Sequence, residues 1–442
     1  MLLVGNGLLI TRDENNTIIV DGCVAIKNQQ IIEIGTTAEL RTKYSGAKFL
    51  DAKQKLIMPG LINTHMHFYS TFARGMSLKD TPPSNFGELL KRLWWRLDKA
   101  LTIEDVYYST MVPIIDCIKN GVTTVFDHHA SPNAVTGSLF TISEATKKAG
   151  LRSCLCYEVS DRDGERITEE GINENVDFIQ YCNKEQDPML KAMFGLHASF
   201  TLSDHTLEKC VIQNSDSGVG FHIHAAEGIE DLSISKTRHG MGVIERLWQR
   251  RILGNKSIAV HCVHISEKEM QILKDSETNV VHNPESNMGN AVGVAPVLEM
   301  FHRGICLGLG TDGYTCDMLE SLKVANCLHK YANNNPSAAW GEPPSMLFQN
   351  NGRIAETYFE KPLGRLIPGA FADIIIVDYI PPTRLDSNNL NSHLLFGVSG
   401  RSVDTTIING QIVLENRKLV YVDEDEVYSK SRELADLVWR RF

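Results

Sequence analysis

The chain has 442 residues, of which 43% are hydrophobic and 22% are charged, a composition typical of ordinary globular proteins. Its length exceeds the size at which one hydrophobic core usually stops growing, so we expect about two domains. The formal net charge is -10 at pH 7. This balance argues against nucleic acid as the main partner, because no basic stripe is available to neutralise phosphates.

The N-terminus and the cysteines indicate the compartment. The first residues, MLLVGNGLLITRDENN, make a poor signal peptide and predict a first β-strand. No segment approaches the ~18 apolar residues of a membrane span. The 10 cysteines are scattered and form no CxxC pair, which is typical of reduced thiols. We therefore expect a cytoplasmic protein with no membrane partner and no thiolate zinc site.

The two ends of the chain share a sequence pattern that differs from that of the middle. Short strand-like runs with turns fill residues 1–35 and 371–421, and Asn409-Gly410 is a strong hairpin turn. We predict that residues 1–57 and 367–442 form one small β domain around an inserted domain, residues 58–366. Helical spacing from Asp423 to Phe442 predicts a terminal helix, which we group with the β domain.

Apolar runs alternate with helix-like segments through the middle of the chain. Eight βα units over about 310 residues predict a (β/α)8 TIM barrel, and a doubly wound sheet is the alternative. Nearly every run ends in His, Asp or Glu, which favours the barrel because barrel active sites collect at the carboxyl ends of the strands. The runs are IMPGLINTHMH, GVTTVFDHH, LRSCLCYEVS, LKAMFGLHAS, GVGFHIHAAE, SIAVHCVH, TNVVHNPES and GICLGLGTDG.

Two pairs of histidines end the first and fifth runs. His65 and His67 lie two residues apart, so both imidazoles can point to one face of a strand. His222 and His224 repeat this spacing, and Glu227 follows three residues later. Neutral imidazole suits Zn²⁺ and a free carboxylate suits a proton shuttle. The alternative for each pair is a structural role in a loop or in the core.

The eighth run ends in Asp312, a carboxylate that can bind a metal and also accept a proton from water. Gly308, Gly310 and Gly313 around it spell G-x-G-x-x-G, the dinucleotide fingerprint. We discount a nucleotide, because that motif belongs to a βαβ unit with an acid at the end of its second strand. His261 ends the sixth run and could face the same centre, whereas His264 could be a surface residue.

These motifs, in this order, resemble the amidohydrolase superfamily over nearly the whole chain. MPGLINTHMHF, HIHAAE, AVHCVH and LGTDG are similar to its signatures for strands one, five, six and eight. NPESNMG and GLHASFTLS resemble the branch of cytosine, guanine and S-adenosylhomocysteine deaminases and triazine hydrolases, and DHHAS is most similar to the SsnA group of aminohydrolases. The resemblance implies that the terminal β domain is a β-sandwich and that the protein is a homodimer.

The resemblance also implies the metal site. His65, His67, His224 and Asp312 would bind one divalent metal, with zinc preferred and iron as the alternative. Binuclear members of the superfamily carry a carboxylated lysine at the end of strand four. Here that position reads GLHAS, and Lys191 starts the strand instead, so we expect a single metal.

The expected reaction is hydrolytic deamination of a small N-heterocyclic amine, such as a purine, a pyrimidine or a related ring. The metal activates water, Asp312 accepts its proton, His261 orients and polarises it, and Glu227 protonates a ring nitrogen. The expected substrate contacts are less specific: His197 resembles a substrate-facing histidine of the family, and Arg74 could hold the substrate or only pair with a carboxylate. The remaining candidates at strand ends are Asn287, Ser286, His128 and His129.

Several alternatives remain open from the sequence. The run SNMGNAVG replaces the Leu-Ala-Ser-Gly sequence that many deaminases of this branch carry, so their substrates cannot simply be transferred. Hydrolysis of a cyclic amide, or of a C–Cl or C–S bond, would use the same water. A different class of protein, a metal-free scaffold with the same barrel fold, is a further alternative. Trp94 and Trp95 could cover an aromatic substrate or pack a dimer interface.

Overall fold

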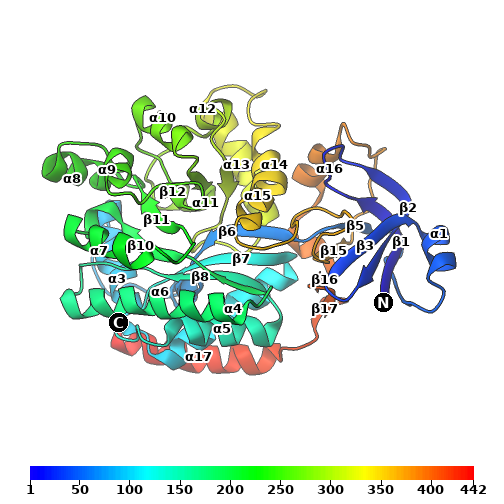
Figure 1. Cartoon of the computed structure of the whole chain (residues 1–442), viewed down its shortest axis with the longest axis horizontal. Helices are drawn as coiled ribbons and strands as arrows, with labels where there is room; N and C mark the ends of the chain where they lie inside the picture. The colour runs from blue at the N-terminus through cyan, green and yellow to red at the C-terminus, as the bar shows by residue number, and fades with distance from the viewer.

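Parallel strands and surrounding helices form the larger body of the protein, a (β/α)8 barrel. The computed structural model describes residues 1–442, and Figure 1 shows the barrel beside a smaller β-rich part. The barrel strands pair in the orders β6-β7-β8-β9 and β10-β11-β12-β13-β14. Their bounds are β6 Leu61–Met66, β7 Val122–His129, β8 Arg152–Tyr157, β9 Leu190–Ala192, β10 Phe194–Ala198, β11 Phe221–Ala225, β12 Ile258–His261, β13 Asn279–His282 and β14 Leu307–Leu309.

Two parallel bridges connect these sheets where the strands end. Val159, after β8, pairs with Leu196 of β10, and Met66 of β6 pairs with Asp312 after β14. The backbone N–H of Asp312 also donates to the carbonyl oxygen of His65 at 3.1 Å. The carboxyl ends of the first and eighth barrel strands therefore lie side by side, as the predicted site requires.

Helices follow most barrel strands and cover the outside of the barrel (Figure 1). None of them is both long and apolar enough to cross a membrane. They are α4 Ile103–Lys119, α5 Ser138–Ala149, α6 Glu165–Glu185, α7 Asp204–Asn214, α8 Ile229–His239, α9 Val243–Gln249, α10 Glu267–Asp275, α11 Pro284–Gly289, α12 Val297–His302, α13 Met318–Ala332, α14 Glu342–Ser345 and α15 Asn351–Glu356.

Local sequence sets where several of these helices begin. The Ser266 side chain accepts a hydrogen bond from the backbone of Glu269, whose carboxylate accepts one from the backbone of Ser266. This capping box satisfies two backbone donors that the first turn of α10 leaves free. Thr102 and Asp105 form the same arrangement at the start of α4.

Strands from both ends of the chain pair in one nine-stranded sheet. Strand β5 pairs in parallel with β1 and antiparallel with β15, and thereby joins the N-terminal and C-terminal strands. The sheet contains β1 Leu2–Ile10, β2 Ile18–Lys27, β3 Gln30–Thr36, β4 Lys48–Asp51, β5 Leu56–Pro59, β15 Ile374–Val377, β16 Val403–Ile408, β17 Gln411–Glu415 and β18 Lys418–Leu419. Helices α1 Thr37–Lys43 and α16 Leu390–Gly397 accompany it.

A buried ion pair connects this sheet to the barrel. Arg152, at the start of β8, donates from Nη2 to Oδ1 of Asp373 at 3.0 Å and from Nε to Oδ2 at 3.1 Å. Both side chains are almost fully buried, with 0% and 2% exposed. The backbone N–H of Asn409 also donates to Asp373 at 2.7 Å. One carboxylate thus holds a barrel strand and the hairpin of the terminal sheet together.

The terminal helix α17, Glu424–Arg441, packs along the barrel helix α4, although its sequence position groups it with the β domain (Figure 1). The indole N–H of Trp439 donates to the carbonyl oxygen of Phe72 at 2.8 Å, and the Arg441 guanidinium donates to the carbonyl oxygen of Ala100 at 2.8 Å. The helix therefore supports the barrel and its loops.

A long connection after the first barrel strand crosses the carboxyl ends of the strands. It consists of short helical segments: η1 Phe68–Ala73, α2 Phe86–Leu89, η2 Leu90–Trp94, α3 Trp95–Leu97 and η3 Asp98–Ala100. Its aromatic and apolar side chains line the cavity described below.

Candidate metal centre and active site

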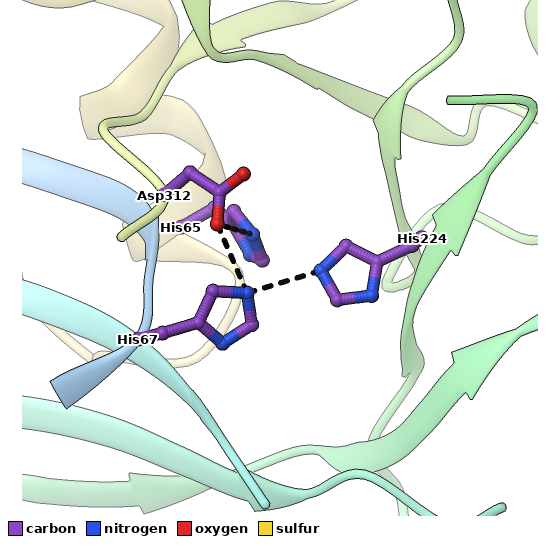
Figure 2. A group of neighbouring side chains, drawn as sticks. All are labelled: His65, His67, His224 and Asp312. Atoms are coloured by element: carbon purple, nitrogen blue, oxygen red, sulfur yellow. Dashed lines mark hydrogen bonds and ion pairs between the residues drawn. The ribbon is translucent and has the colours of Figure 1, made fainter. Parts of the chain in front are cut away.

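Four side chains from three strand ends converge on one point (Figure 2). His65 and His67 come from the end of β6, His224 from β11, and Asp312 from the turn after β14. One ligand atom of each lies within 4.8 Å of the others. The Nε2 atom of His67 lies 3.1 Å from Nε2 of His224 and 3.1 Å from Oδ1 of Asp312.

The hydrogen bonds of His67 and His224 occupy one ring nitrogen of each histidine and leave the other nitrogen facing the cluster. Nδ1 of His67 lies 2.5 Å from the carbonyl oxygen of His128, and Nδ1 of His224 lies 2.9 Å from that of His197. A carbonyl can only accept, so each Nδ1 carries a proton, and Nε2 is the atom that offers a lone pair once the ring is neutral. Nε2 of His65 is buried and has no hydrogen-bond partner. Three imidazoles and one carboxylate suit a catalytic divalent metal.

The charges of the cluster are arranged for such an ion. Burial lowers the pKa of His65 to about 3, and burial together with neighbouring histidines lowers that of His224 well below its usual range. Burial opposes ionisation of Asp312, but the neighbouring imidazoles of His65, His67 and His261 hold its pKa well below the usual value. Two neutral imidazoles therefore face an ionised carboxylate.

A second group, Glu227, His261 and Asp312, lies beside the four candidate ligands and shares Asp312 with them. Nε2 of His261 is 3.5 Å from Oε2 of Glu227 and 3.6 Å from Oδ2 of Asp312. Burial and the charge of Asp312 raise the pKa of Glu227 well above its usual value, which favours the protonated form of this carboxyl group. His261 and Asp312 adopt left-handed backbone conformations with φ of 73° and 54°, which is uncommon for residues other than glycine.

The segment after β13 holds these groups in place. Nδ1 of His261 lies 2.8 Å from Oδ1 of Asn287, and the Ser286 hydroxyl donates to Oδ2 of Asp312 at 2.6 Å. The amide of Asn290 donates to Oε1 of Glu227 at 3.3 Å. The SNMGN part of the sequence thus contacts the reacting groups of the site directly, with its side chains fixed by helix α11.

The structure distinguishes the positions of His128, His129 and His222, whose roles the sequence left open. His128 is fully buried, and its ring stacks on that of His222 at 4.6 Å. Nε2 of His222 lies 2.9 Å from Nδ1 of His65, which makes His222 a support for a metal ligand. Nε2 of His129 instead contacts the Ser131 hydroxyl at 2.9 Å, away from the cluster.

Of the other predicted substrate contacts, some line the cavity beside the cluster and others do not. His197 lines the cavity beside the cluster, and Asn287 contacts His261 rather than the cavity. Arg74 does not line this cavity: its side chain is 63% exposed and pairs with Asp116 at 3.2 Å, the simpler of its two possible roles. His264 contacts the carbonyl oxygen of Val292 at 2.8 Å.

The glycines and the lysine noted in the sequence have structural explanations. A Cβ atom at Gly310 would lie 2.4 Å from the Asn283 side chain, and one at Gly308 would lie 2.7 Å from that of Asn351. The G-x-G-x-x-G spelling therefore reflects close packing inside the barrel. Lys191 lies in β9, where it is paired with Cys154 of β8.

The cluster opens onto a cavity with many aromatic walls. Trp94 and Trp95 both line it, so they face the substrate space. The Trp95 ring lies 6.3 Å from that of His197 and 6.4 Å from that of Phe200. The other lining residues include Tyr69, Phe86, Leu90, Lys91, Asp98, Glu158, Arg162, Glu227, Glu230, Asp231, Ile234, Asn290 and Tyr314.

The sequence analysis did not identify two charged residues that line this cavity, Glu158 and Arg162. Glu158 follows β8, and its side chain is only 2% exposed. Oε1 lies 3.3 Å from Nδ1 of His67 and 3.3 Å from Nδ1 of His128. Burial raises the pKa of Glu158 to about 7. Arg162 lies four residues later and pairs with Asp98. The signal was present, because the third run, LRSCLCYEVS, places this acid at a strand end.

A barrel with this donor set, an adjacent carboxyl group of raised pKa and a cavity with aromatic walls is typical of a metal-dependent hydrolase. The chain belongs to the amidohydrolase family, which it matches over residues 56–413. It is 32% identical to 5'-deoxyadenosine deaminase of Methanobrevibacter smithii, over 94% of each chain. It is 30% identical to 5-methylthioadenosine/S-adenosylhomocysteine deaminase of Pelotomaculum thermopropionicum, over 98% of each chain. The predicted family is confirmed, and the protein is a hydrolase of carbon–nitrogen bonds other than peptide bonds.

Solved structures of similar fold include two with zinc. An adenosine deaminase from Xanthomonas campestris with bound zinc has a TM-score of 0.88 and 22% identity, and the match covers 99% of this chain and 98% of the other. Atrazine chlorohydrolase from Arthrobacter aurescens, complexed with zinc, has a TM-score of 0.81 and 22% identity, with 98% and 100% covered. These similarities confirm the predicted fold class.

Proposed function

We propose that the protein is an aminohydrolase with one zinc ion, which replaces the amino group of an N-heterocyclic amine by oxygen and releases ammonia. One observation carries the proposal: the carboxyl groups of Glu227 and Asp312 both face Nε2 of His261 beside the four candidate ligands, and their pKa values are shifted in opposite directions. A proton donor and a proton acceptor thus meet at one reaction centre, as hydrolytic deamination requires.

The metal ligands would be His65, His67, His224 and Asp312. When bound there, zinc supplies Lewis-acid activation of water. A single ion fits the donor set, because His67 and His224 each offer only Nε2. Their Nδ1 atoms donate to backbone carbonyl oxygens.

The side chains then move protons in a balanced sequence. Asp312 accepts a proton from water as the water oxygen bonds to the amino-bearing carbon, and Glu227 gives its proton to the adjacent ring nitrogen. In the tetrahedral intermediate, Asp312 passes its proton to the amino group and the C–N bond breaks. The hydroxyl proton of the intermediate returns to Glu227, ammonia leaves, and both carboxyl groups regain their starting states. Nε2 of His261 accepts a hydrogen bond from the attacking water and orients it, because Nδ1 of the neutral ring already donates to Asn287.

The walls of the cavity support a flat substrate. Trp94, Trp95 and Phe200 offer aromatic faces and edges near His197, and such surfaces favour aromatic rings. The relatives are named for deaminases of adenosine derivatives. We accordingly place the substrate among purines, pyrimidines and related rings.

An ammonia-release screen of the zinc-loaded protein tests this function. The panel should contain guanine, cytosine, 5'-deoxyadenosine and an aminotriazine, with a cyclic amide and a chlorotriazine as competitors. Ammonia formation that a chelator stops and zinc restores supports the proposal. Opening of the cyclic amide, or release of chloride, without ammonia from any amine would replace it with the corresponding hydrolase activity.

Two further proposals concern the state of the protein. All ten cysteines are free thiols, which supports a reducing, cytoplasmic compartment. The family resemblance supports a homodimer, and light scattering coupled to gel filtration tests it: a mass near the 49.4 kDa of one chain would contradict it.

A further inference from the structure

A buried acid and a buried base lie side by side in the cavity, outside the proposed proton-transfer groups. Glu158 follows β8, and Arg162 lies in the loop that precedes α6. Both line the cavity, with side chains 2% and 10% exposed. Oε1 of Glu158 and Nη1 of Arg162 are buried atoms without a hydrogen-bond partner. Such atoms are costly unless a ligand satisfies them.

The position of Glu158 shows which part of a substrate it would meet. Its Oε1 atom lies 3.3 Å from Nδ1 of the ligand His67, and its Oε2 atom lies 3.8 Å from Nε2 of His197. A carboxyl group this close to the candidate metal ligands would meet the reacting ring of a substrate. A substituent that extends from the ring, such as a ribose, would lie farther towards the cavity mouth.

The neighbours of Arg162 show what kind of group it would bind. Asp98 and Asp163 both pair with its guanidinium, the latter at 3.1 Å from Nε, and its carbon Cζ lies 5.3 Å from the Trp95 ring. These contacts fix the guanidinium and neutralise its charge. The acids that line the cavity also outnumber its lysine and arginine. The free Nη1 therefore suits a neutral acceptor, such as a carbonyl oxygen, better than a phosphate or a carboxylate.

We propose that Glu158 and Arg162 form a recognition edge for a ring with adjacent N–H and C=O groups, so that the preferred substrate is an amino-substituted lactam heterocycle. Glu158 accepts from the ring N–H, and Arg162 donates to the carbonyl oxygen. The inference rests on the proposed deaminase function. It also separates this chain from its named relatives, because the adenine ring of 5'-deoxyadenosine, substituted at N9, has no ring N–H to donate.

Matched substrate pairs test the recognition edge. Cytosine and guanine carry the lactam edge, whereas 1-methylcytosine and 1-methylguanine lack its N–H group. For the zinc-loaded protein we expect kcat/KM to be at least tenfold higher for cytosine or guanine than for its methylated analogue and for 5'-deoxyadenosine. Equal rates, or a preference for 5'-deoxyadenosine, would overturn the proposal.

Variants then assign the preference to the two side chains. Glu158→Gln and Arg162→Gln should each raise KM for the lactam substrate by about 10–100-fold, the loss expected for one charged hydrogen bond, while bound zinc stays near one equivalent. Neither variant should change kcat/KM for 5'-deoxyadenosine by the same factor. Glu165→Gln and Arg166→Gln, at exposed positions nearby, are the matched controls. Loss of zinc, or an equal loss on all substrates, would mean that Glu158 only supports His67.

A binding measurement keeps this inference separate from the proposed function. If no compound releases ammonia, the stabilisation of the zinc-loaded protein by cytosine and by 1-methylcytosine is compared by thermal unfolding. Stabilisation by cytosine alone, lost in Glu158→Gln, would support the recognition edge and refute the deaminase function. Stabilisation by neither compound, or by both equally, would refute the recognition edge.

Discussion

The Nδ1 atom of His261 lies 2.8 Å from the Oδ1 atom of Asn287, and this contact fixes the protonation state of the histidine ring. An amide oxygen can only accept, so Nδ1 carries the hydrogen when the ring is neutral. Burial lowers the pKa of His261. A ring held in this way presents Nε2 to Glu227 and Asp312 in one tautomer, ready to exchange a proton.

Removal of that contact should weaken turnover without removing the ligands. We expect Asn287→Ala to lower kcat by about 10–100-fold, as is typical when a partner that orients a functional histidine is lost. Asn287→Asp keeps an acceptor oxygen at the same place and should restore part of the rate. Steady-state kinetics with the substrate found in the screen checks both. Equal damage from the two variants would show that the packing of this side chain matters more than its oxygen atom.

Glu227→Gln should separate metal binding from chemistry. Glu227 is absent from the four-ligand cluster, so we expect the variant to keep its zinc while kcat falls by about 10²–10⁴-fold, the usual contribution of one acid–base group. Metal analysis and ammonia release on the same sample provide the test. Glu299→Gln, on the outer helix α12, is the control. Near-normal turnover of Glu227→Gln would contradict the role of this residue as a proton donor.

Metal binding should release a proton from His67. Burial opposes a charge on this ring, but Asp312 and Glu158 raise its pKa to about 10 in the metal-free protein. Since a metal binds only the neutral imidazole, zinc uptake at pH 7.5 should free about one proton, and affinity should fall as the pH is lowered. Titration calorimetry in two buffers of different ionisation enthalpy measures that proton. Zinc uptake without a buffer effect would exclude this protonated state.

His129 should make stability depend on pH. Burial lowers its pKa to about 3, from an ordinary 6.5. Between these values the unfolded chain binds a proton that the folded chain does not, so the free energy of unfolding falls as the pH drops from 6.5 towards 3. His129→Gln should flatten this fall, measured by urea unfolding at pH 7.5, 5.5 and 4.5. A variant whose pH dependence matches that of the parent protein would refute the prediction.

Loss of the buried ion pair between Arg152 and Asp373 should lower the free energy of unfolding far more than loss of a surface ion pair. Arg152→Met leaves a buried carboxylate unpaired, and we expect a loss of about 3–5 kcal/mol in the free energy of unfolding. Arg74→Met breaks the exposed pair with Asp116, and we expect a loss of about 0–1 kcal/mol. Denaturant unfolding of both variants compares them. Similar losses would show that burial does not set the strength of the Arg152 pair.

The barrel and the convergence of the four candidate ligands could be predicted, because both follow from the sequence periodicity and the spacing of the residues. Residues two apart on a strand share a face, which brings His65 and His67 to one side, and a strand that ends in Asp312 delivers that carboxylate to the barrel mouth. These arguments need only the local sequence and the rule that parallel strands end at one rim.

Other parts of the site depend on contacts that no local pattern shows. Glu158 ends a strand as Asp312 does, but only the fold shows that it touches His67 and His128. Arg162 lies in a loop, and its role arises from Asp98, which is distant in sequence. Arg74 follows the first strand closely, yet a nearby helix supplies the partner that turns it away. Tertiary packing decides such cases.

The place where α17 ends has a practical consequence for work with this protein. The guanidinium of Arg96 donates to the carbonyl oxygen of Phe442 at 2.6 Å, and the neighbouring Trp95 lines the cavity. An affinity tag or a surface linker joined at Phe442 would therefore disturb the contact with Arg96, which is the residue next to this cavity wall. The N-terminal residue lies on the far side of the molecule, in the terminal sheet (Figure 1). Immobilisation through the N-terminus should leave catalysis intact where attachment through Phe442 would not.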